Sequence, residues 1–378
     1  MQYEDILGQK EIKKQLQQTI AENRVSHAQL FLGPEGSGTL PMALAYATEI
    51  LCTNTNKNKQ ASFLKCQKLA HPDLHLVFPT NTTTLVKKNA IYKAFQAEFR
   101  EAVFENPYLS LNQWLDHLGI GNKQGSINVA SSQEIIRDIS LKPFESDYKV
   151  VIFWMVEKLH PSASNKLLKI LEEPPAKTTF ILIAENPELL LQTIISRTQI
   201  VKFNKLHKED IKKGLSEKFN LKDEELNAVV ALSDGNFLEA IRHVESGGSL
   251  AFNRDSFISW MRLAFKRDIP GLIKWVEKIG PIGREHQKGF LAFSLHIFRE
   301  SLIKNTGVFE LTQMEGVEDK FVTNFAPFVN GTTAHEFIKE FSEAHYYIER
   351  NANPRILFMD LSIKVMILIK SARKVIAA

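Results

Sequence analysis

A glycine-rich loop near the N-terminus has the spacing of a phosphate-binding loop. It reads Gly33-Pro34-Glu35-Gly36-Ser37-Gly38-Thr39-Leu40. In a working loop of the Gly-x-x-x-x-Gly-Lys-Ser/Thr type, backbone N–H groups surround the phosphates, the lysine neutralises their charge, and the hydroxyl binds magnesium. Gly33, Gly36 and Gly38 are present, but Thr39 replaces the lysine and Leu40 replaces the hydroxyl residue. We therefore expect weak or absent nucleotide binding and no hydrolysis at this loop.

A strand further along the chain lacks the acids that the same chemistry requires. Enzymes with a phosphate-binding loop hold magnesium through an aspartate at the end of an apolar strand. Trp154 and Met155 stand where an Asp-Glu pair is expected after the apolar run 150–153. Glu157 follows too late to replace that pair, because small misplacements of a catalytic group are costly. Trp154 and Met155 are therefore interpreted as core residues, and no catalytic metal is expected.

Strands and helices alternate around these motifs. Short apolar runs predict strands at 28–32, 74–78, 149–155, 178–184 and 200–203. Helical spacing and capping signals predict helices at 9–22, 42–51, 132–139, 163–173 and 189–195. The glycine loop thus lies between a strand and a helix, which favours a phosphate-binding loop over a plain glycine turn. The alternation predicts an α/β core at 1–204, with a parallel sheet covered by helices on both faces.

The remainder of the chain predicts only helices. A small helical unit is expected at 205–246, followed by a linker at Ser246-Gly247-Gly248-Ser249 and an all-helical domain at 249–378. Helix breaks in that domain are expected near Pro270, Pro281 and Asn305.

Two segments of the predicted core lack clear strands. The polar stretch 53–62 is interpreted as a loop, and 80–128 as an insertion with one helix near 91–104. The insertion is rich in aromatic residues, which predict a small core of its own, with a docking surface as the alternative. These residues are Tyr92, Phe95, Phe99, Phe104, Tyr108 and Trp114.

Composition restricts the class of protein. The 378 residues include 47 basic and 43 acidic side chains, for a net charge of +4, which permits contact with phosphates but does not favour a stand-alone nucleic-acid binder. Two cysteines form no disulfide framework, so a reducing cytoplasm is the expected location. No run of about 18 apolar residues free of charges occurs, so no membrane contact is expected.

Several stretches resemble the bacterial clamp-loader subunits of DNA polymerase III, which belong to the AAA+ class. The segment 165–175, Asn-Lys-Leu-Leu-Lys-Ile-Leu-Glu-Glu-Pro-Pro, closely resembles a hallmark of that family. The segment 194–199, with Ser196-Arg197-Thr198, is similar to its Ser-Arg-Cys motif, and 27–36 and Gly8-Gln9 also match. The resemblance spans roughly residues 3–240. Because both ATP motifs are damaged, the chain resembles the ATPase-inactive delta-prime group of this family. The alternative is an active AAA+ ATPase with divergent motifs.

The resemblance implies a fold, partners and one functional residue. It implies an AAA+ module, a small helical lid and a helical collar, assembled with gamma/tau and delta subunits into a hetero-pentamer. That assembly would act on a sliding clamp and primer-template DNA. Arg197 would be an arginine finger that reaches the ATP of the adjacent subunit, with Ser196 supporting it. A surface arginine that stabilises a helix end is the alternative. Leu238 stands where active relatives place a nucleotide-sensing arginine.

The same resemblance raises the question of zinc. The family often carries a four-cysteine zinc site, of which Cys52 and Cys66 match the first and fourth ligands while the middle pair is missing. Two cysteines cannot complete a tetrahedral site, and Pro72 makes His71 and His75 a poor replacement pair. We therefore expect that zinc has been lost and that no cofactor is bound.

Overall fold

The structure is a computed structural model that describes residues 1–376 except 54, 56–57, 89, 121–122, 246–248, 306–315, 332 and 351. The chain divides into two compact units. The first comprises Met1–Asn220 and Asp234–Glu239, and the second comprises Leu221–Ser233 and Ala240–Ala378. The three-part division at 1–204, 205–246 and 249–378 stays a prediction, and most of its linker lies outside the described residues.

The first unit is built on a five-stranded sheet in which every neighbouring pair is parallel. The strands are β1 Ala28–Leu32, β2 Leu74–Val77, β3 Lys149–Trp154, β4 Thr178–Ala184 and β5 Gln199–Lys202, in the order β2-β3-β4-β1-β5. Every residue of β3 and β4 is buried, as expected for strands covered on both faces. All five predicted strands are confirmed.

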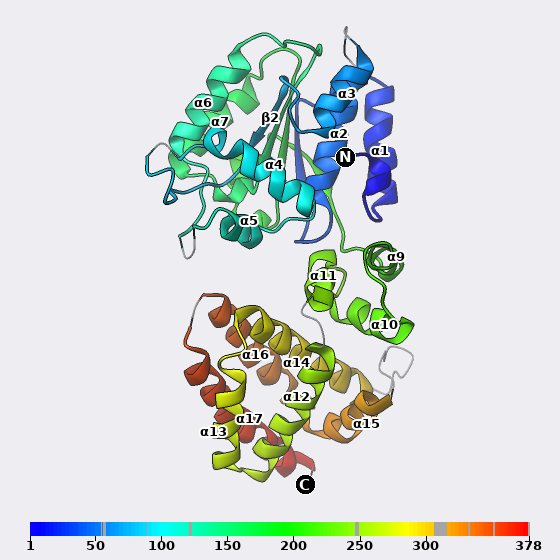
Figure 1. Cartoon of the computed structure of the whole chain (residues 1–378), viewed down its shortest axis with the longest axis vertical. Coiled ribbons are helices and arrows are strands. Elements are labelled where there is room, and N and C mark those ends of the chain that lie inside the picture. The colour runs from blue at the N-terminus through cyan, green and yellow to red at the C-terminus, as the bar shows by residue number, and fades with distance from the viewer. Residues whose placement is uncertain are drawn as a thin grey trace. The chain divides into compact units, whose positions relative to one another are not determined.

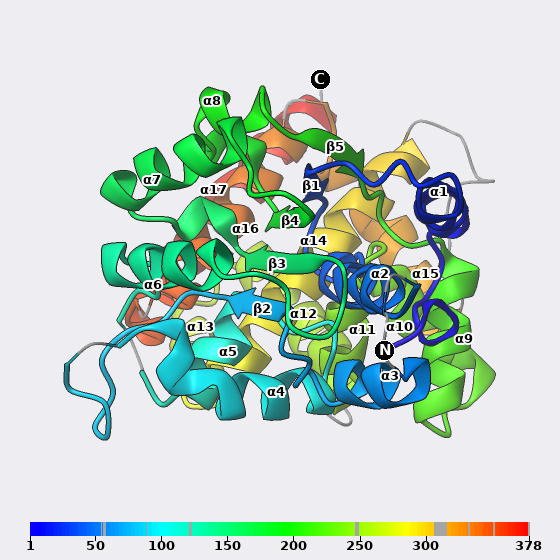
Figure 2. The same ribbon diagram turned by 90° about the horizontal axis from the view of Figure 1, so that it is seen from above.

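Helices cover both faces of this sheet, as predicted. The helices of the first unit are α1 Lys10–Ala21, α2 Thr39–Thr53, α3 Lys59–Gln67, α4 Gln96–Glu105, α5 Leu111–His117, α6 Val129–Ser140, α7 Pro161–Glu172, α8 Gln192–Ile195 and α9 Lys208–Lys218, of which α9 lies away from the sheet. Figures 1 and 2 show α1 and α2 on one face and α6 and α7 on the other. Because the sheet is parallel, the carboxyl ends of β1, β3 and β4 meet at one edge, where the glycine loop follows β1.

Four local predictions need correction. The helix predicted at 189–195 begins only at Gln192, because Leu191 is extended, and in the other three cases side-chain caps start helices inside polar stretches. The segment 53–62 is not all loop, since the Asn58 side chain accepts hydrogen bonds from Gln60 N and Ala61 N and starts α3. The insertion holds a second helix, α5, which begins with a capping box between Ser110 and Gln113. Helix α6 begins three residues earlier than predicted.

The aromatic residues of the insertion extend the main core and do not form a separate one. The Phe78 and Phe99 rings stack at 4.0 Å, and the Trp114 ring meets both edge-on. Phe99 also contacts Trp154 of β3, with ring centroids 5.5 Å apart. The prediction that these rings are structural is therefore confirmed for the buried ones, while Phe104 is 56% exposed.

The second unit contains only helices among its described residues. They are α10 Asp223–Leu232, α12 Ser249–Lys266, α13 Ile269–Ile279, α14 Arg284–Asn305, α15 Gly316–Phe325, α16 Ala334–Glu349 and α17 Pro354–Ile376, and α11 Phe237–Glu245 runs from the first unit into it. Its core is aromatic, with the Trp260 and Trp275 rings stacked at 4.4 Å. None of the described helices is long and apolar enough to cross a membrane.

Candidate functional site

The glycine loop has the backbone conformation of a phosphate nest. It connects β1 to α2, and Gly33 N donates to Ala184 O at the end of β4. Gly36 and Gly38 have φ values of 74° and 91°, which only glycine adopts without strain. Glycines with positive φ are a feature of nests, in which successive backbone N–H groups form an anion-binding concavity. The loop has therefore kept the nest while losing the lysine and the hydroxyl.

Tyr108 of the insertion packs against this loop. A Cβ atom built on Gly38 would lie 3.2 Å from Tyr108 Cε1, so the ring lies directly against the loop. Leu7 N donates a 2.8 Å hydrogen bond to Tyr108 Oη, and the ring meets Phe237 edge-on at 5.0 Å. Tyr108 is buried, and burial raises its pKa well above the ordinary value, so it remains neutral.

The residues at the start of α11 also lie against the glycine loop. A Cβ atom on Gly36 would lie 1.9 Å from Asn236 Oδ1, and Phe237 N approaches Gly36 O at 3.4 Å. Asn236 Oδ1 accepts from Leu238 N and caps α11, while Asn236 Nδ2 points to Glu35 Oε1 at 3.4 Å. Leu238, at the predicted sensor position, is fully buried. Ser37, Thr39 and Leu40 are also buried.

The N-terminal Gly8-Gln9 motif fixes the loop to the sheet. Gln9 Nε2 donates to Ser37 O at 3.1 Å and to Asn204 O at 2.7 Å. One amide therefore connects the glycine loop to the backbone that follows β5, which stabilises the nest without any ligand.

The strand that should carry magnesium ligands carries core residues. Trp154 and Met155 are buried, as interpreted from the sequence. Glu157 lies beyond the strand, and its Oε1 accepts from Glu185 N at 2.9 Å. Its carboxylate therefore serves the backbone at the end of β4. No three His, Cys, Asp or Glu side chains converge as metal ligands in the part of the chain that the structure describes.

Glu185 is a site residue that the sequence reasoning missed. It directly follows β4, and burial, with the nearby Glu35 and Glu157, raises its pKa to about 8, against the attraction of Lys158. Burial and two neighbouring carboxylates both disfavour the charged form of Glu185, so the acid stays protonated near neutral pH. The only sequence signal was its place after a buried strand.

Glu185→Gln should flatten the pH dependence of stability. The carboxyl group has a higher pKa folded than unfolded, so its contribution is complete at low pH and is lost as pH rises from about 4.5 to about 8. The neutral amide avoids this loss. The free energy of unfolding of the variant should therefore rise relative to that of the wild type across that pH window, by an amount on the order of 2 kcal/mol. Urea unfolding near pH 5 and above pH 8 measures the difference. The exposed Glu188→Gln should show no such trend.

Arg197 lies at the surface just after α8. Its Nη2 forms an ion pair with Glu172 Oε1 at 2.6 Å, and its Nη1 donates to Thr193 O at 3.0 Å and to Ser196 Oγ at 3.3 Å. The Arg197 side chain is 34% exposed. Ser196 thus contacts the guanidinium, as its predicted supporting role requires, although the finger role itself stays a prediction.

Cys52 and Cys66, which match two of the four zinc ligands of the family, are free cysteines. A hydrogen bond to Cys52, together with burial, raises the pKa of Cys66, so its thiol stays protonated. His71 Nδ1 accepts from Asp73 N at 3.2 Å, and burial lowers the pKa of both His71 and His75. Loss of zinc stays a prediction.

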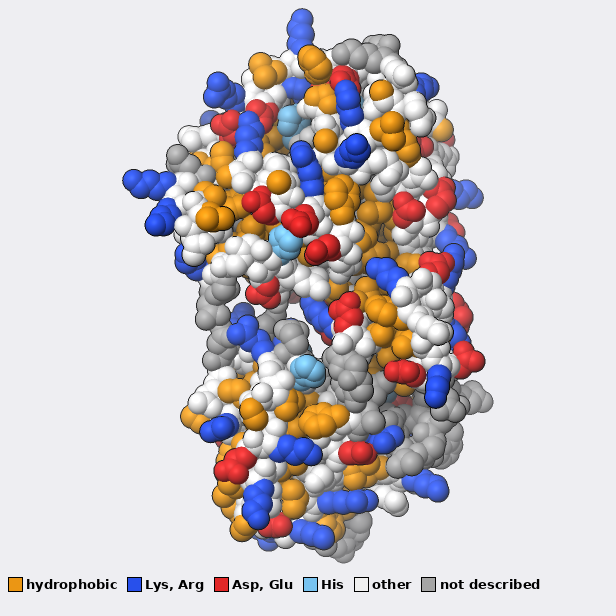
Figure 3. Space-filling model, viewed as in Figure 1, with side chains coloured by type: hydrophobic (Ala, Val, Ile, Leu, Met, Phe, Trp, Pro, Cys, Tyr) orange, Lys and Arg blue, Asp and Glu red, His pale blue; other side chains and the backbone are white. Residues whose placement is uncertain are grey.

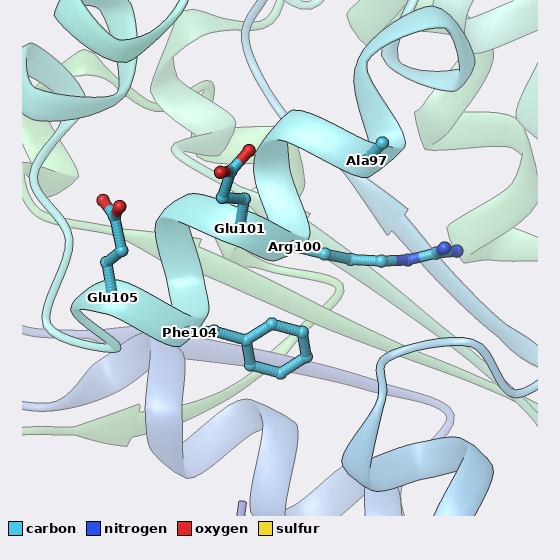
Figure 4. Close-up of a pocket in the computed structure, with 5 residues that line it drawn as sticks. All are labelled: Ala97, Arg100, Glu101, Phe104 and Glu105. Atoms are coloured by element: carbon cyan, nitrogen blue, oxygen red, sulfur yellow. The ribbon is translucent and has the colours of Figure 1, made fainter.

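Part of the exposed surface of the insertion is formed by α4. Figure 4 shows Arg100 and Phe104, four residues apart on α4, projecting from the same side of the helix, beside a hollow also lined by Ala97, Glu101 and Glu105. On the face seen in Figure 3, basic side chains are interspersed with acidic ones among the coloured residues. Neither feature favours a stand-alone nucleic-acid binder.

These observations define a class. A parallel sheet with helices on both faces, a glycine loop after β1 and a helical remainder are the features of a P-loop module of the AAA+ type. A family model described as DNA polymerase III, delta subunit, matches residues 8–207. The chain therefore belongs to the DNA polymerase III delta subunit family of clamp-loader proteins.

Two relatives from Bacillus subtilis (strain 168) agree with this assignment. DNA polymerase III subunit delta′ is 32% identical over 212 residues, which cover 55% of this chain and 51% of the relative. DNA polymerase III subunit tau is 20% identical over 389 residues, which cover 96% of this chain and 61% of the relative. The chain thus spans about half the length of the first relative. The resemblance to delta-prime clamp-loader proteins is confirmed.

Solved structures with low similarity also include clamp-loader proteins. A gamma-subunit-related protein of Thermotoga maritima has 14% identity and a TM-score of 0.38, with 93% of this chain and 99% of that chain covered. The Bacillus subtilis clamp loader delta protein has 9% identity and a TM-score of 0.32, with 94% and 99% covered. Such scores carry little weight beside the family match.

Proposed function

We propose that this chain is a non-catalytic subunit of the DNA polymerase III clamp loader and supplies Arg197 to the ATP site of a neighbouring subunit. The observation that carries the proposal is the glycine loop itself: Thr39 and Leu40 stand where the lysine and the hydroxyl residue are expected, and Tyr108 and Asn236 pack against Gly38 and Gly36. A nest with no lysine and no magnesium ligand cannot stabilise the charge that develops during phosphoryl transfer.

Arg197 suits a role in trans because of its chemistry and its surface position. A guanidinium is always charged and offers a planar fork of N–H donors that matches phosphate oxygens. Leu189, Leu191 and Ile200, close to Arg197 in sequence, are exposed apolar residues of the kind that a subunit contact buries. These features support an interface at which Arg197 reaches another subunit's nucleotide.

The partners follow from the family. Gamma/tau and delta subunits would complete a cytoplasmic hetero-pentamer that acts on the sliding clamp and primer-template DNA. The relatives named tau and delta′ support clamp-loader partners, and the pentamer, clamp and DNA are proposed by analogy. No cofactor is proposed for this chain.

The isolated chain should neither bind nor hydrolyse Mg–ATP. Calorimetric titration should give no heat of binding, and phosphate release should equal the rate without protein, because the loop lacks the lysine and Tyr108 packs against Gly38. An active clamp-loader ATPase subunit in the same assay provides the positive control. Mg–ATP bound and cleaved by this chain alone would overturn the proposal and would favour an active ATPase with divergent motifs.

A further inference from the structure

The Arg197 guanidinium is held by its own chain on two nitrogens. Nη2 pairs with Glu172 Oε1 at 2.6 Å, and Nη1 donates to Thr193 O and Ser196 Oγ. Both partners of the ion pair remain partly exposed, at 34% for Arg197 and 49% for Glu172. The guanidinium is therefore fixed in orientation and still reachable from solvent.

The ion pair has little value for stability. Exposed pairs contribute little to folding, because solvent screens them and two long side chains lose freedom. Glu172 is also the last residue of α7, where the negative end of the helix dipole disfavours a carboxylate. Glu172 therefore lies at a helix end where a positive charge is more favourable, and it forms an ion pair with Arg197.

The support behind Glu172 is firm. Glu173 N donates to Lys169 O and ends α7, and Pro174 and Pro175 then restrict the backbone. Leu171, beside Glu172, is buried in the core of the first unit. A carboxylate on a rigid helix end holds the arginine more reproducibly than solvent does.

We infer that Glu172 is a positioning residue that orients Arg197 toward the phosphates of the neighbouring subunit's ATP. This inference rests on the proposed role of Arg197. An unrestrained arginine loses considerable rotamer freedom when it docks, whereas a guanidinium already held by Glu172 and Thr193 has lost that freedom before the transition state forms. Glu172 acts through Arg197 and does not touch the reacting atoms.

The test uses the complete reconstituted clamp loader, with active ATPase subunits beside this chain. Glu172→Ala should lower kcat for ATP by roughly 10- to 100-fold, with KM and assembly unchanged, because the arginine is misplaced and not removed. Glu172→Gln keeps an oxygen acceptor for Nη2 and should retain most of the rate. Glu173→Ala, which removes the adjacent exposed carboxylate, is the matched control and should behave as wild type.

A double-mutant cycle separates positioning from a general effect on the fold. Adding Glu172→Ala to Arg197→Ala should not lower the residual rate further, because Glu172 has nothing left to orient. A further equal loss in that background would overturn the inference, as would a Glu172→Ala complex that hydrolyses ATP at or above the wild-type rate while Arg197→Ala is slow. Normal hydrolysis by Arg197→Ala would instead overturn the proposed function itself.

Discussion

Arg197→Ala should lower ATP turnover in the reconstituted complex about 10³-fold or more at the site it serves, while the complex still assembles. The guanidinium would be lost from a surface position, so the fold of this chain should change little. The measurement is the rate of a single turnover of ATP, compared between complexes that contain the wild-type chain and the variant. Size-exclusion chromatography verifies assembly.

Two variants sharpen this result. Arg197→Lys keeps a positive charge but loses the planar fork, so its rate should fall between wild type and Arg197→Ala. Arg24→Ala removes another exposed arginine of the first unit and should leave turnover unchanged. If the Arg197→Ala complex turns over ATP at the wild-type rate, the residue is an ordinary surface arginine at a helix end.

The sheet was predictable because its signals are local. Strands buried on both faces are apolar throughout, as β3 and β4 are, and glycine and proline bound the elements between them. The missing lysine and acids were equally visible, since a motif is defined by residue types at fixed spacing. Helix α3 was missed because its only start signal was one asparagine in a polar stretch.

The contacts that Tyr108 and Asn236 make with the glycine loop were not predictable, because they join distant segments of the chain. Tyr108 is 70 residues from Gly38 in the sequence, and Asn236 is 200 residues from Gly36. Nothing in the types of these residues indicates that they meet. The pairing of Glu172 with Arg197 is hidden in the same way, although both belong to recognised motifs. The sequence motifs indicated where the candidate site lies, whereas the residues that pack against it depend on the tertiary structure.

The residue at the position where a magnesium ligand is expected lies against the insertion. Trp154 takes a position where an acid is expected, and its ring packs on Phe99 of α4. A carboxylate there would be buried against an aromatic ring, which is costly without a cation. The insertion therefore supplies Phe99, which packs against Trp154 of β3, and Tyr108, which packs against Gly38 of the glycine loop.

Trp114→Ala should lower the free energy of unfolding by about 3–5 kcal/mol. The indole ring is fully buried, packs edge-on against Phe78 and Phe99, and donates a 2.7 Å hydrogen bond to Pro79 O. The substitution leaves a cavity and removes the hydrogen-bond donor of a buried carbonyl. Urea unfolding of the full chain, followed by circular dichroism, measures the loss.

Phe104→Ala is the matched control for this large effect. Phe104 is an aromatic residue of the same insertion, but it is 56% exposed at the surface of α4 (Figure 4), so its removal should change stability by less than about 0.5 kcal/mol. A clear difference between the two variants is required if the insertion rings extend the core of the sheet. Equal, small effects would mean that Trp114 contributes little to that core, and the aromatic residues would then be better explained as a docking surface.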